Sequence, residues 1–427
     1  LAALRLKSTY KIAVAVLSLL LTTSVYGVEL YLNAAEHARF RPDKALLALE
    51  GESKEVKQQA ARIAKQFGVD VDTRDRIEVI EGFAKQGIEA VPQIILPMFD
   101  QQPGDGIKSA IRINGVEVMP LAGISDKMTV VCNQNGEYLT YRSDERGFHN
   151  PKGSWQSGKL EIAAVGNSFT MGYCVPSDKN YVALMRERYP NILNLGMAGE
   201  GPLHILAVLK EYVEPLRPKR VLWFYFEGNN LGELQDEKRS PLLIRYLEEG
   251  FSQGLPARQS DIDQALIAFV KRQRAKEVNQ PRKPSNRALG RMRDVVKLSA
   301  LRERLGLVYG RSGEDIETAS EANLSLFRGI LQRAKQRVGA CGGQIYFIYL
   351  PGWERYAHAD PGIGGQQRAQ VLNYVESLGI PLIDVLPAFA AQADPLSLFP
   401  FQRPGHYNEK GQRLVADEVL KSLNTTR

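Results

Sequence analysis

The chain has 427 residues, of which 44% are hydrophobic and 24% are charged, and its formal net charge is +7. This length suggests two or three domains, and the apolar fraction is enough for at least one large core. The sequence has neither the concentrated basic face nor a motif that specific nucleic-acid binding requires, so we expect no nucleic-acid partner.

The first 32 residues carry the pattern of an export segment. Arg5, Lys7 and Lys11 precede an uncharged run at 12–28, which is close to the shortest length that spans a bilayer. Basic residues before the run favour export of the rest of the chain. A signal peptide cleaved near Gly27 is one interpretation. We favour a retained signal anchor over 12–32, because apolar character continues after Glu29.

Residues 33–142 predict a small α+β region without evident chemistry. Two amphipathic helices are expected, over 55–67 and 76–86. Asn135-Gly136 lies between two β-rich runs and predicts a hairpin. The three cysteines have no spacing typical of a zinc site, and we expect no metal. In an exported chain Cys132 and Cys174 are the pair we expect to form a disulfide, and three reduced thiols are the alternative.

From residue 160 onward the pattern changes to short apolar runs that alternate with helical periodicity. This alternation predicts a parallel sheet covered by helices on both faces, a flavodoxin-like three-layer α/β/α domain. Five strands are expected, at 160–165, 191–195, 221–226, 344–350 and 380–385.

A long insertion, at about 231–320, separates the third and fourth expected strands. It is helical in character and rich in charge, and its most basic part is 271–293. We interpret it as a solvated helical insertion. A groove for an anionic polymer or an anionic membrane surface is the alternative.

Polar residues that could take part in catalysis follow the strands, where active sites of open α/β sheets form. Ser168 comes where the first strand turns toward a helix, so its hydroxyl can be exposed. A glycine loop containing Gly199 follows the second strand, and Asn229 follows the third. An asparagine amide can donate to an oxyanion without a change of charge. His406 precedes the last helix and can reach back to deprotonate Ser168.

These four segments, in this order, resemble the SGNH (GDSL-type) hydrolase family. GNSFT is similar to its first block, NLGMAGEGP to its second, FEGNN to its third and GHYNEKG to its last. The resemblance covers about 143–423, and SDERGFHNP at 143–151 is like a segment of membrane-anchored bacterial members. It implies Ser168 as nucleophile, His406 as base, and oxyanion donors from the Ser168 N–H, Gly199 and Asn229. We therefore expect an SGNH domain over 143–427.

Three departures from the family pattern affect this interpretation. Asn167 and Asn230 stand where the family usually has Asp, and Arg403 and Pro404 stand where it often has an acid before the histidine. That acid normally orients the imidazole. Its absence implies a Ser–His dyad, a backbone carbonyl as the orienting group, or a carboxylate from elsewhere. The candidates for such a carboxylate are Asp384 and Asp394.

The resemblance implies ester chemistry on an exported substrate through an acyl-serine, either as an esterase or as an O-acyltransferase. Membrane-anchored members are often tied to cell-surface polysaccharide modification, so we expect an O-acetylated carbohydrate as substrate. No metal or organic cofactor is implied. The expected partners are that substrate and a membrane through 12–32, with the catalytic domain outside the cytoplasm. The alternative is a catalytically degenerate SGNH domain that binds glycan or serves as a scaffold in an export assembly.

Overall fold

The computed structural model describes residues 70–95, 101–102, 106–134, 136–156, 159–279, 313–357 and 365–425, with a few positions between 17 and 65. Most of the expected membrane segment at 12–32, of the expected helix at 55–67 and of the basic segment at 271–293 lies outside these residues. No helix in the described ranges combines the length and the apolar composition that crossing a bilayer requires.

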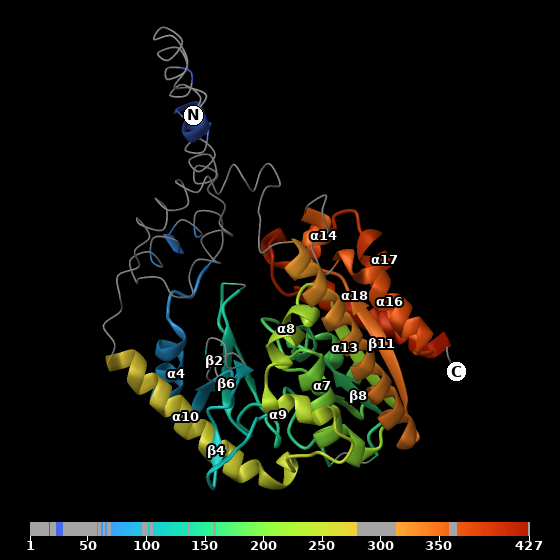
Figure 1. Cartoon of the computed structure of the whole chain (residues 1–427). Helices are drawn as coiled ribbons and strands as arrows, with labels where there is room; N and C mark the ends of the chain where they lie inside the picture. Colours follow the sequence, from blue (N-terminus) through green and yellow to red (C-terminus); the bar gives the residue numbers. More distant parts are fainter. Residues whose placement is uncertain are drawn as a thin grey trace, which may run out of the picture.

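A five-stranded parallel sheet forms the centre of the molecule (Figure 1), as the alternating pattern predicts. The spatial order of its strands is β12-β11-β10-β8-β9. In chain order this is 2-1-3-4-5, the flavodoxin-like order, whose switch point lies between β8 and β10. The strands are β8 (Ile162–Val165), β9 (Ile192–Asn194), β10 (Arg220–Phe226), β11 (Gln344–Leu350) and β12 (Leu382–Asp384).

Side chains of β10 alternate between two hydrophobic layers, because successive residues of a strand face opposite sides. Val221, Trp223 and Tyr225 join the larger core. Four helices that cover that face are α7 (Pro202–Val208), α8 (Asn230–Glu237), α13 (Gly313–Ala340) and α16 (Arg368–Ser377). Leu222 and Phe224 join the second core. It is covered by α6 (Tyr181–Arg186), α17 (Leu386–Ala390) and α18 (Glu409–Thr425).

Between residues 70 and 142, the described part of the region before the sheet consists of a helix and short strands. In a three-stranded sheet, β1 (Ala90–Pro92) is parallel to β6 (Met128–Cys132), which pairs antiparallel with β7 (Leu139–Arg142), so the expected hairpin is confirmed. Its loop at 133–138 is longer than the two residues of a tight turn. The remaining elements are α4 (Arg76–Lys85), β2 (Gln101–Gln102), β3 (Gly106–Ile107), β4 (Arg112–Ile113) and β5 (Val116–Glu117).

Two helices of the insertion follow α8, namely α9 (Pro241–Ile244) and α10 (Gln259–Asn279). The long helix α10 runs alongside α4 and β4 rather than over the central sheet (Figure 1). Arg274 of α10 pairs with Glu81 of α4, and Asp263 accepts a hydrogen bond of 2.9 Å from the backbone N–H of Ser125. The insertion thus holds the N-terminal region against the rest of the molecule.

The segment 143–151 connects that region to the sheet through buried polar contacts. Asp144 accepts hydrogen bonds of 2.8 Å from Asn150 Nδ2 and from Trp155 Nε1. Asn150 also pairs with the backbone of Asn194 in β9, donating to its carbonyl and accepting from its N–H, each at 2.8 Å. Burial raises the pKa of Asp144 to about 6. These contacts fix the end of β9, from which the glycine loop begins.

Asn150→Ala is expected to lower the free energy of unfolding by about 2–4 kcal/mol. The substitution leaves the buried N–H and carbonyl of Asn194 without their Asn150 partners, and it removes one of the two donors to Asp144 Oδ2. Denaturant unfolding of both proteins measures the change. Lys152→Ala is the matched control, because the Lys152 side chain is 70% exposed and its ion pair with Asp126 should contribute about 0–1 kcal/mol. Equal stability of the two variants would contradict a clamping role for Asn150.

Candidate active site

Ser168 lies at the carboxyl end of β8, beside the switch point of the sheet. It is the first residue of a short helix, α5 (Ser168–Met171), and only 7% of it is exposed. The side chain of Asn167 caps this helix by accepting a hydrogen bond of 3.1 Å from the Phe169 N–H. The first departure from the family pattern therefore keeps the turn, because an amide oxygen accepts this bond as a carboxylate would.

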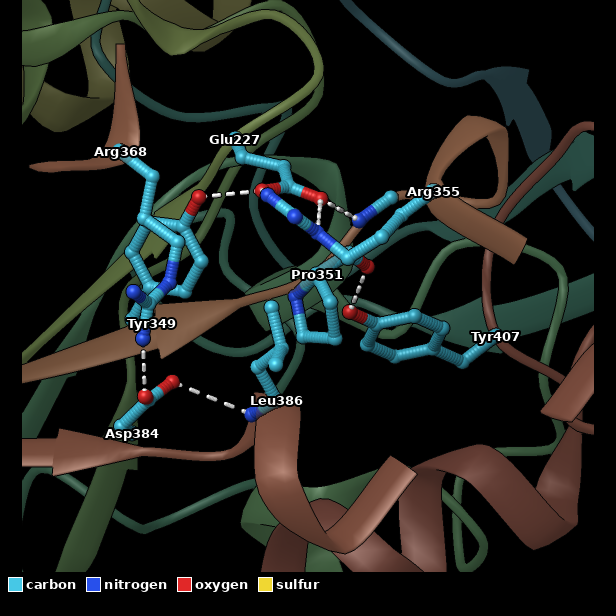
Figure 2. Close-up of polar contacts among 9 residues, drawn as sticks. Glu227, Tyr349, Pro351, Arg355, Arg368, Asp384, Leu386 and Tyr407 are labelled. Atoms are coloured by element: carbon cyan, nitrogen blue, oxygen red, sulfur yellow. Dashed lines mark hydrogen bonds and ion pairs between the residues drawn. The ribbon is translucent and has the colours of Figure 1, made fainter. Parts of the chain in front are cut away.

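His406 reaches the serine from the segment that precedes α18. Its Nε2 lies 2.8 Å from Ser168 Oγ, although 238 residues separate the two in sequence. The rings of Phe169 and Tyr173 contact the imidazole, each with a centroid distance of 4.7 Å. The next residue, Tyr407, is fully buried and donates to the Pro351 carbonyl (Figure 2).

Burial lowers the pKa of His406 to about 4, since a desolvated site disfavours the charged imidazolium. The neutral ring is therefore the dominant form well below the usual histidine pKa of about 6.5. Neutral Nε2 can accept the hydroxyl proton of Ser168, which leaves the ring proton on Nδ1.

We expect the acid limb of kcat/KM to have its midpoint near pH 4 rather than near 6.5. The free enzyme loses its base only when His406 is protonated, and burial moves that event to lower pH. Hydrolysis of a small acetyl ester between pH 3.5 and 8 measures the profile. Circular dichroism at each pH checks that the protein stays folded. A midpoint near 6.5 in folded protein would contradict this prediction.

The partner of the Nδ1 atom of His406 is the side chain of Gln134, whose Oε1 lies 3.3 Å away. This residue belongs to the loop between β6 and β7, for which no chemistry was expected.

Neither candidate carboxylate orients the imidazole. Asp384 pairs with Arg368 and accepts from the Leu386 N–H (Figure 2). Asp394 accepts from the Leu396 N–H and from Gln402 Nε2, at 3.1 and 2.8 Å.

The glycine loop after β9 packs closely against the serine turn. The Met197 N–H donates to the Gly166 carbonyl at 3.3 Å. A Cβ at Gly196 would lie 2.5 Å from the Met171 backbone nitrogen, so only glycine fits there. Gly199 has a φ of +82°, in the left-handed region that favours glycine. This loop therefore presents its backbone beside the turn that carries Ser168.

Asn229 lies beside the same turn, at the end of β10. Its Oδ1 accepts a hydrogen bond of 3.0 Å from Asn167 Nδ2, and its own Nδ2 donates to Glu233 Oε1 at 2.9 Å. The amide group has two N–H donors, and this bond to Glu233 uses one of them. The fully buried Asn230 holds two backbone segments, since its Oδ1 accepts from the Phe226 N–H at 2.7 Å and its Nδ2 donates to the Glu200 carbonyl at 3.3 Å.

A buried acidic cluster supports the glycine loop from behind. Glu237 accepts from the backbone N–H groups of Gly201 and Leu203, at 2.7 and 2.8 Å, at the start of α7. Burial raises the pKa of Glu237 to about 7. Burial and the neighbouring carboxyls also raise the pKa of Glu233 well above its ordinary value. The imidazole of His204, in α7, lies 2.9 Å from Glu200 within this cluster.

A second buried carboxylate, Glu227, organises the loop after β11 (Figure 2). It accepts from the Gly352 N–H at 2.6 Å and from Arg355 Nε at 3.0 Å, and it also contacts the Tyr349 hydroxyl. This loop includes Pro351, the acceptor for Tyr407, so Glu227 indirectly fixes the segment that carries His406. The FEGNN block contains Glu227, but its position alone did not indicate this role.

No family model matches the chain, and no curated protein matches it. Solved structures do resemble it. A lipase/acylhydrolase from Enterococcus faecalis has 11% identity and a TM-score of 0.35, covering 62% of this chain and 97% of its own. The psychrotrophic esterase EstA from Pseudoalteromonas sp. has 12% identity and a TM-score of 0.32, and the match covers 62% of this chain and 97% of the esterase chain. A member of the lipolytic G-D-S-L family from Veillonella parvula has 14% identity and a TM-score of 0.32, and the match covers 61% of this chain and 96% of the Veillonella chain.

Similarity at this level says nothing of activity, so the chemistry has to be judged from the side chains. A serine hydroxyl in contact with a neutral imidazole is the arrangement that activates a nucleophile. The backbone of the glycine loop and the Asn229 amide lie beside the turn that carries Ser168. Within the described ranges, no group of three or more His, Cys, Asp or Glu side chains is placed to hold a metal ion.

Proposed function

We propose that the chain is a serine esterase or O-acyltransferase that works through an acyl-serine. The observation that carries this proposal is the 2.8 Å contact between Ser168 Oγ and His406 Nε2 at the carboxyl end of the sheet. Direct hydrogen-bond contact between nucleophile and base is the geometry that proton transfer requires. The position beside the switch point is where open α/β sheets bind ligands.

In the proposed reaction, Ser168 Oγ attacks the ester carbonyl while His406 Nε2 takes the hydroxyl proton. The carbonyl oxygen becomes an oxyanion, for which the N–H groups of Ser168 and Gly199 and the amide of Asn229 are the proposed donors. Collapse of this intermediate breaks the C–O bond, and His406 returns its proton to the leaving alcohol. Water, or a sugar hydroxyl in a transferase, then attacks the acyl-serine and gives its proton to His406. The bond from the acyl carbon to Ser168 Oγ breaks, His406 returns the proton to Oγ, and the acid or the new ester is released.

We propose further that the substrate is an exported, O-acetylated carbohydrate and that residues 12–32 anchor the protein in a membrane. The basic flank and the uncharged run support export. The Cys132–Cys174 disulfide agrees with an oxidising compartment outside the cytoplasm. Reporters fused to the C-terminus, one active only in the cytoplasm and one only outside it, test the topology. A cytoplasmic signal would refute it.

A glycan-binding domain without catalysis is the second candidate. It is favoured by one observation, that Nδ1 of His406 contacts an amide rather than a carboxylate. A neutral amide stabilises the imidazolium of the transition state less than a carboxylate does. A degenerate domain would bind acetylated glycan without acylation of Ser168.

A fluorophosphonate probe distinguishes the two candidates. An activated serine attacks the phosphorus and expels fluoride, so the probe stays on Oγ. We expect covalent labelling of wild type at Ser168, located by peptide mass spectrometry, and none of Ser168→Ala. Hydrolysis of p-nitrophenyl acetate and acetyl transfer to oligosaccharides, measured on the same preparations, separate esterase from transferase. Folded wild type that neither labels nor turns over would support the binding domain.

A further inference from the structure

We propose that Gln134 is the positioning residue for His406 and that the Cys132–Cys174 disulfide holds Gln134 in place. The inference rests on the proposed roles of Ser168 and His406. It means that the N-terminal region, not the SGNH-like domain, completes the site. The family's acid, expected just before the histidine, is replaced here by an amide from 272 residues away in sequence.

The hydrogen-bond pattern around the imidazole defines what Gln134 would do. When Nε2 accepts from Ser168, the ring proton is on Nδ1, and Nδ1 needs an acceptor. Gln134 Oε1 is that acceptor, at 3.3 Å, and it also lies close to Gly405, the residue before the histidine. A bond at Nδ1 fixes both the tautomer and the orientation of the ring, which is the role of the aspartate in a triad.

The disulfide joins the two segments that flank the imidazole. Cys132 is the last residue of β6, two residues before Gln134. Cys174 follows Tyr173, whose ring contacts His406. The Cα atoms of the two cysteines are 5.7 Å apart, and both residues are almost completely buried.

Other contacts hold the same loop. Cys132 and Cys174 belong to a small hydrophobic cluster that also contains Val131, Met171 and Ala198 of the glycine loop. On its other side, Asn133 Nδ2 donates to the Asp72 carbonyl at 2.8 Å. The loop that carries Gln134 is thus fixed from two sides, and a positioning residue needs this rigidity.

Gln134 differs from a carboxylate in a way that can be measured. An amide is neutral, so it orients the ring without adding a charge beside it. Burial is the one cause that lowers the pKa of His406, with no contribution from a charged neighbour in the described part of the chain. Tyr173 is the titratable side chain whose ring faces the imidazole. A carboxylate at position 134 would favour the imidazolium and raise the pKa of His406.

The test compares Gln134→Ala and Gln134→Glu in the full chain, with labelling of Ser168 by a fluorophosphonate as the readout. Gln134→Ala should slow labelling about tenfold, the equivalent of one hydrogen bond. Gln134→Glu should restore labelling above pH 7 and move its acid limb up by about one pH unit or more. The shifted limb would show that position 134 faces the imidazole, and slower labelling of folded Gln134→Ala would show that this contact assists the reaction. Equal rates and limbs in wild type and both variants, each shown to be folded by its melting temperature, would overturn the inference.

The disulfide is tested by the double change Cys132→Ser and Cys174→Ser, with Cys341→Ser as the matched control. Cys341 is a free cysteine just before the amino end of β11, at the opposite edge of the sheet. The double variant should label about as slowly as Gln134→Ala, and adding Gln134→Ala to it should slow labelling little further. Cys341→Ser should label like wild type. Wild-type labelling by a folded double variant would remove the disulfide from the proposal.

An NMR titration of His406 separates failure of this inference from failure of the proposed function. It reports the pKa of the imidazole whether or not Ser168 reacts. If wild type does not label, the proposed function fails, and an upward pKa shift in Gln134→Glu still supports the contact. If wild type labels and the pKa of His406 is the same in Gln134→Glu, only the positioning role fails.

Discussion

Ser168→Ala, His406→Ala and the double variant are each expected to lower kcat/KM for a small acetyl ester by about the same factor, roughly 10⁴-fold or more. The two side chains act as one unit, since the serine is a poor nucleophile without a base and the histidine has nothing to deprotonate without the serine. Removing the second member after the first should therefore cost little. Independent roles would instead multiply the two losses.

The experiment must determine the concentration of active enzyme as well as the rate of turnover. Titration of sites with a fluorophosphonate gives the active fraction of wild type, and melting temperatures show that the variants fold. Ser377→Ala is the matched serine control, because this exposed hydroxyl donates to the Tyr374 carbonyl in α16. It should retain wild-type kcat/KM. A folded His406→Ala variant within tenfold of wild type would contradict the Ser–His unit.

The sheet could be predicted from sequence because its strands are buried on both faces. Continuous apolar runs such as 221–226 and 344–350 mark such strands, and the structure places them as β10 and β11. A parallel sheet brings the carboxyl ends of its strands to one edge. Side chains that follow those ends, such as Ser168 and Asn229, are therefore brought together by the topology alone.

Gln134 could not be predicted in the same way, because its contact depends on how one region packs on another. It follows an antiparallel strand of a small separate sheet, and no spacing relates it to His406. The available indication was indirect. Cys174 is six residues after Ser168. The expected pairing of Cys132 with Cys174 therefore places the loop at 133–138 near the serine turn. Placing the loop in this way depends on knowing that the disulfide forms, and the sequence was also consistent with three reduced thiols.

The buried carboxylates were missed for a different reason. Glu233 and Glu237 are four residues apart in a charged helix, a pattern typical of a solvated face. Glu237 is almost completely buried and Glu233 is half-buried. Both positions follow from tertiary contacts, because α8 packs on α7 and Glu237 caps the backbone N–H groups at the start of α7. Carboxylates are favoured at a helix N-terminus, where unpaired donors are available.

Asn229→Ala is expected to lower kcat about a hundredfold or more, a much larger effect on turnover than on stability. Its amide is proposed to donate to charge that appears only in the transition state, and one such donor typically contributes about 3 kcal/mol to lowering the barrier. The residue makes no capping bond to its own helix. Its bond to Glu233 leaves the second N–H of the amide for the substrate.

Asn229→Asp separates this donor role from a structural one. Aspartate has nearly the same shape and keeps an oxygen that can accept from Asn167, as Asn229 Oδ1 does at 3.0 Å, but it has no N–H to donate. If Asn229 is an oxyanion donor, both variants should lose turnover, and the charge of aspartate should make that variant at least as slow as alanine. If Asn229 only holds the serine turn, aspartate should restore much of the rate that alanine loses. Turnover and thermal unfolding measured on one preparation distinguish the outcomes. An alanine variant that melts earlier but turns over normally per folded molecule would show that Asn229 is a turn residue, and the oxyanion would then depend on the backbone of Ser168 and Gly199.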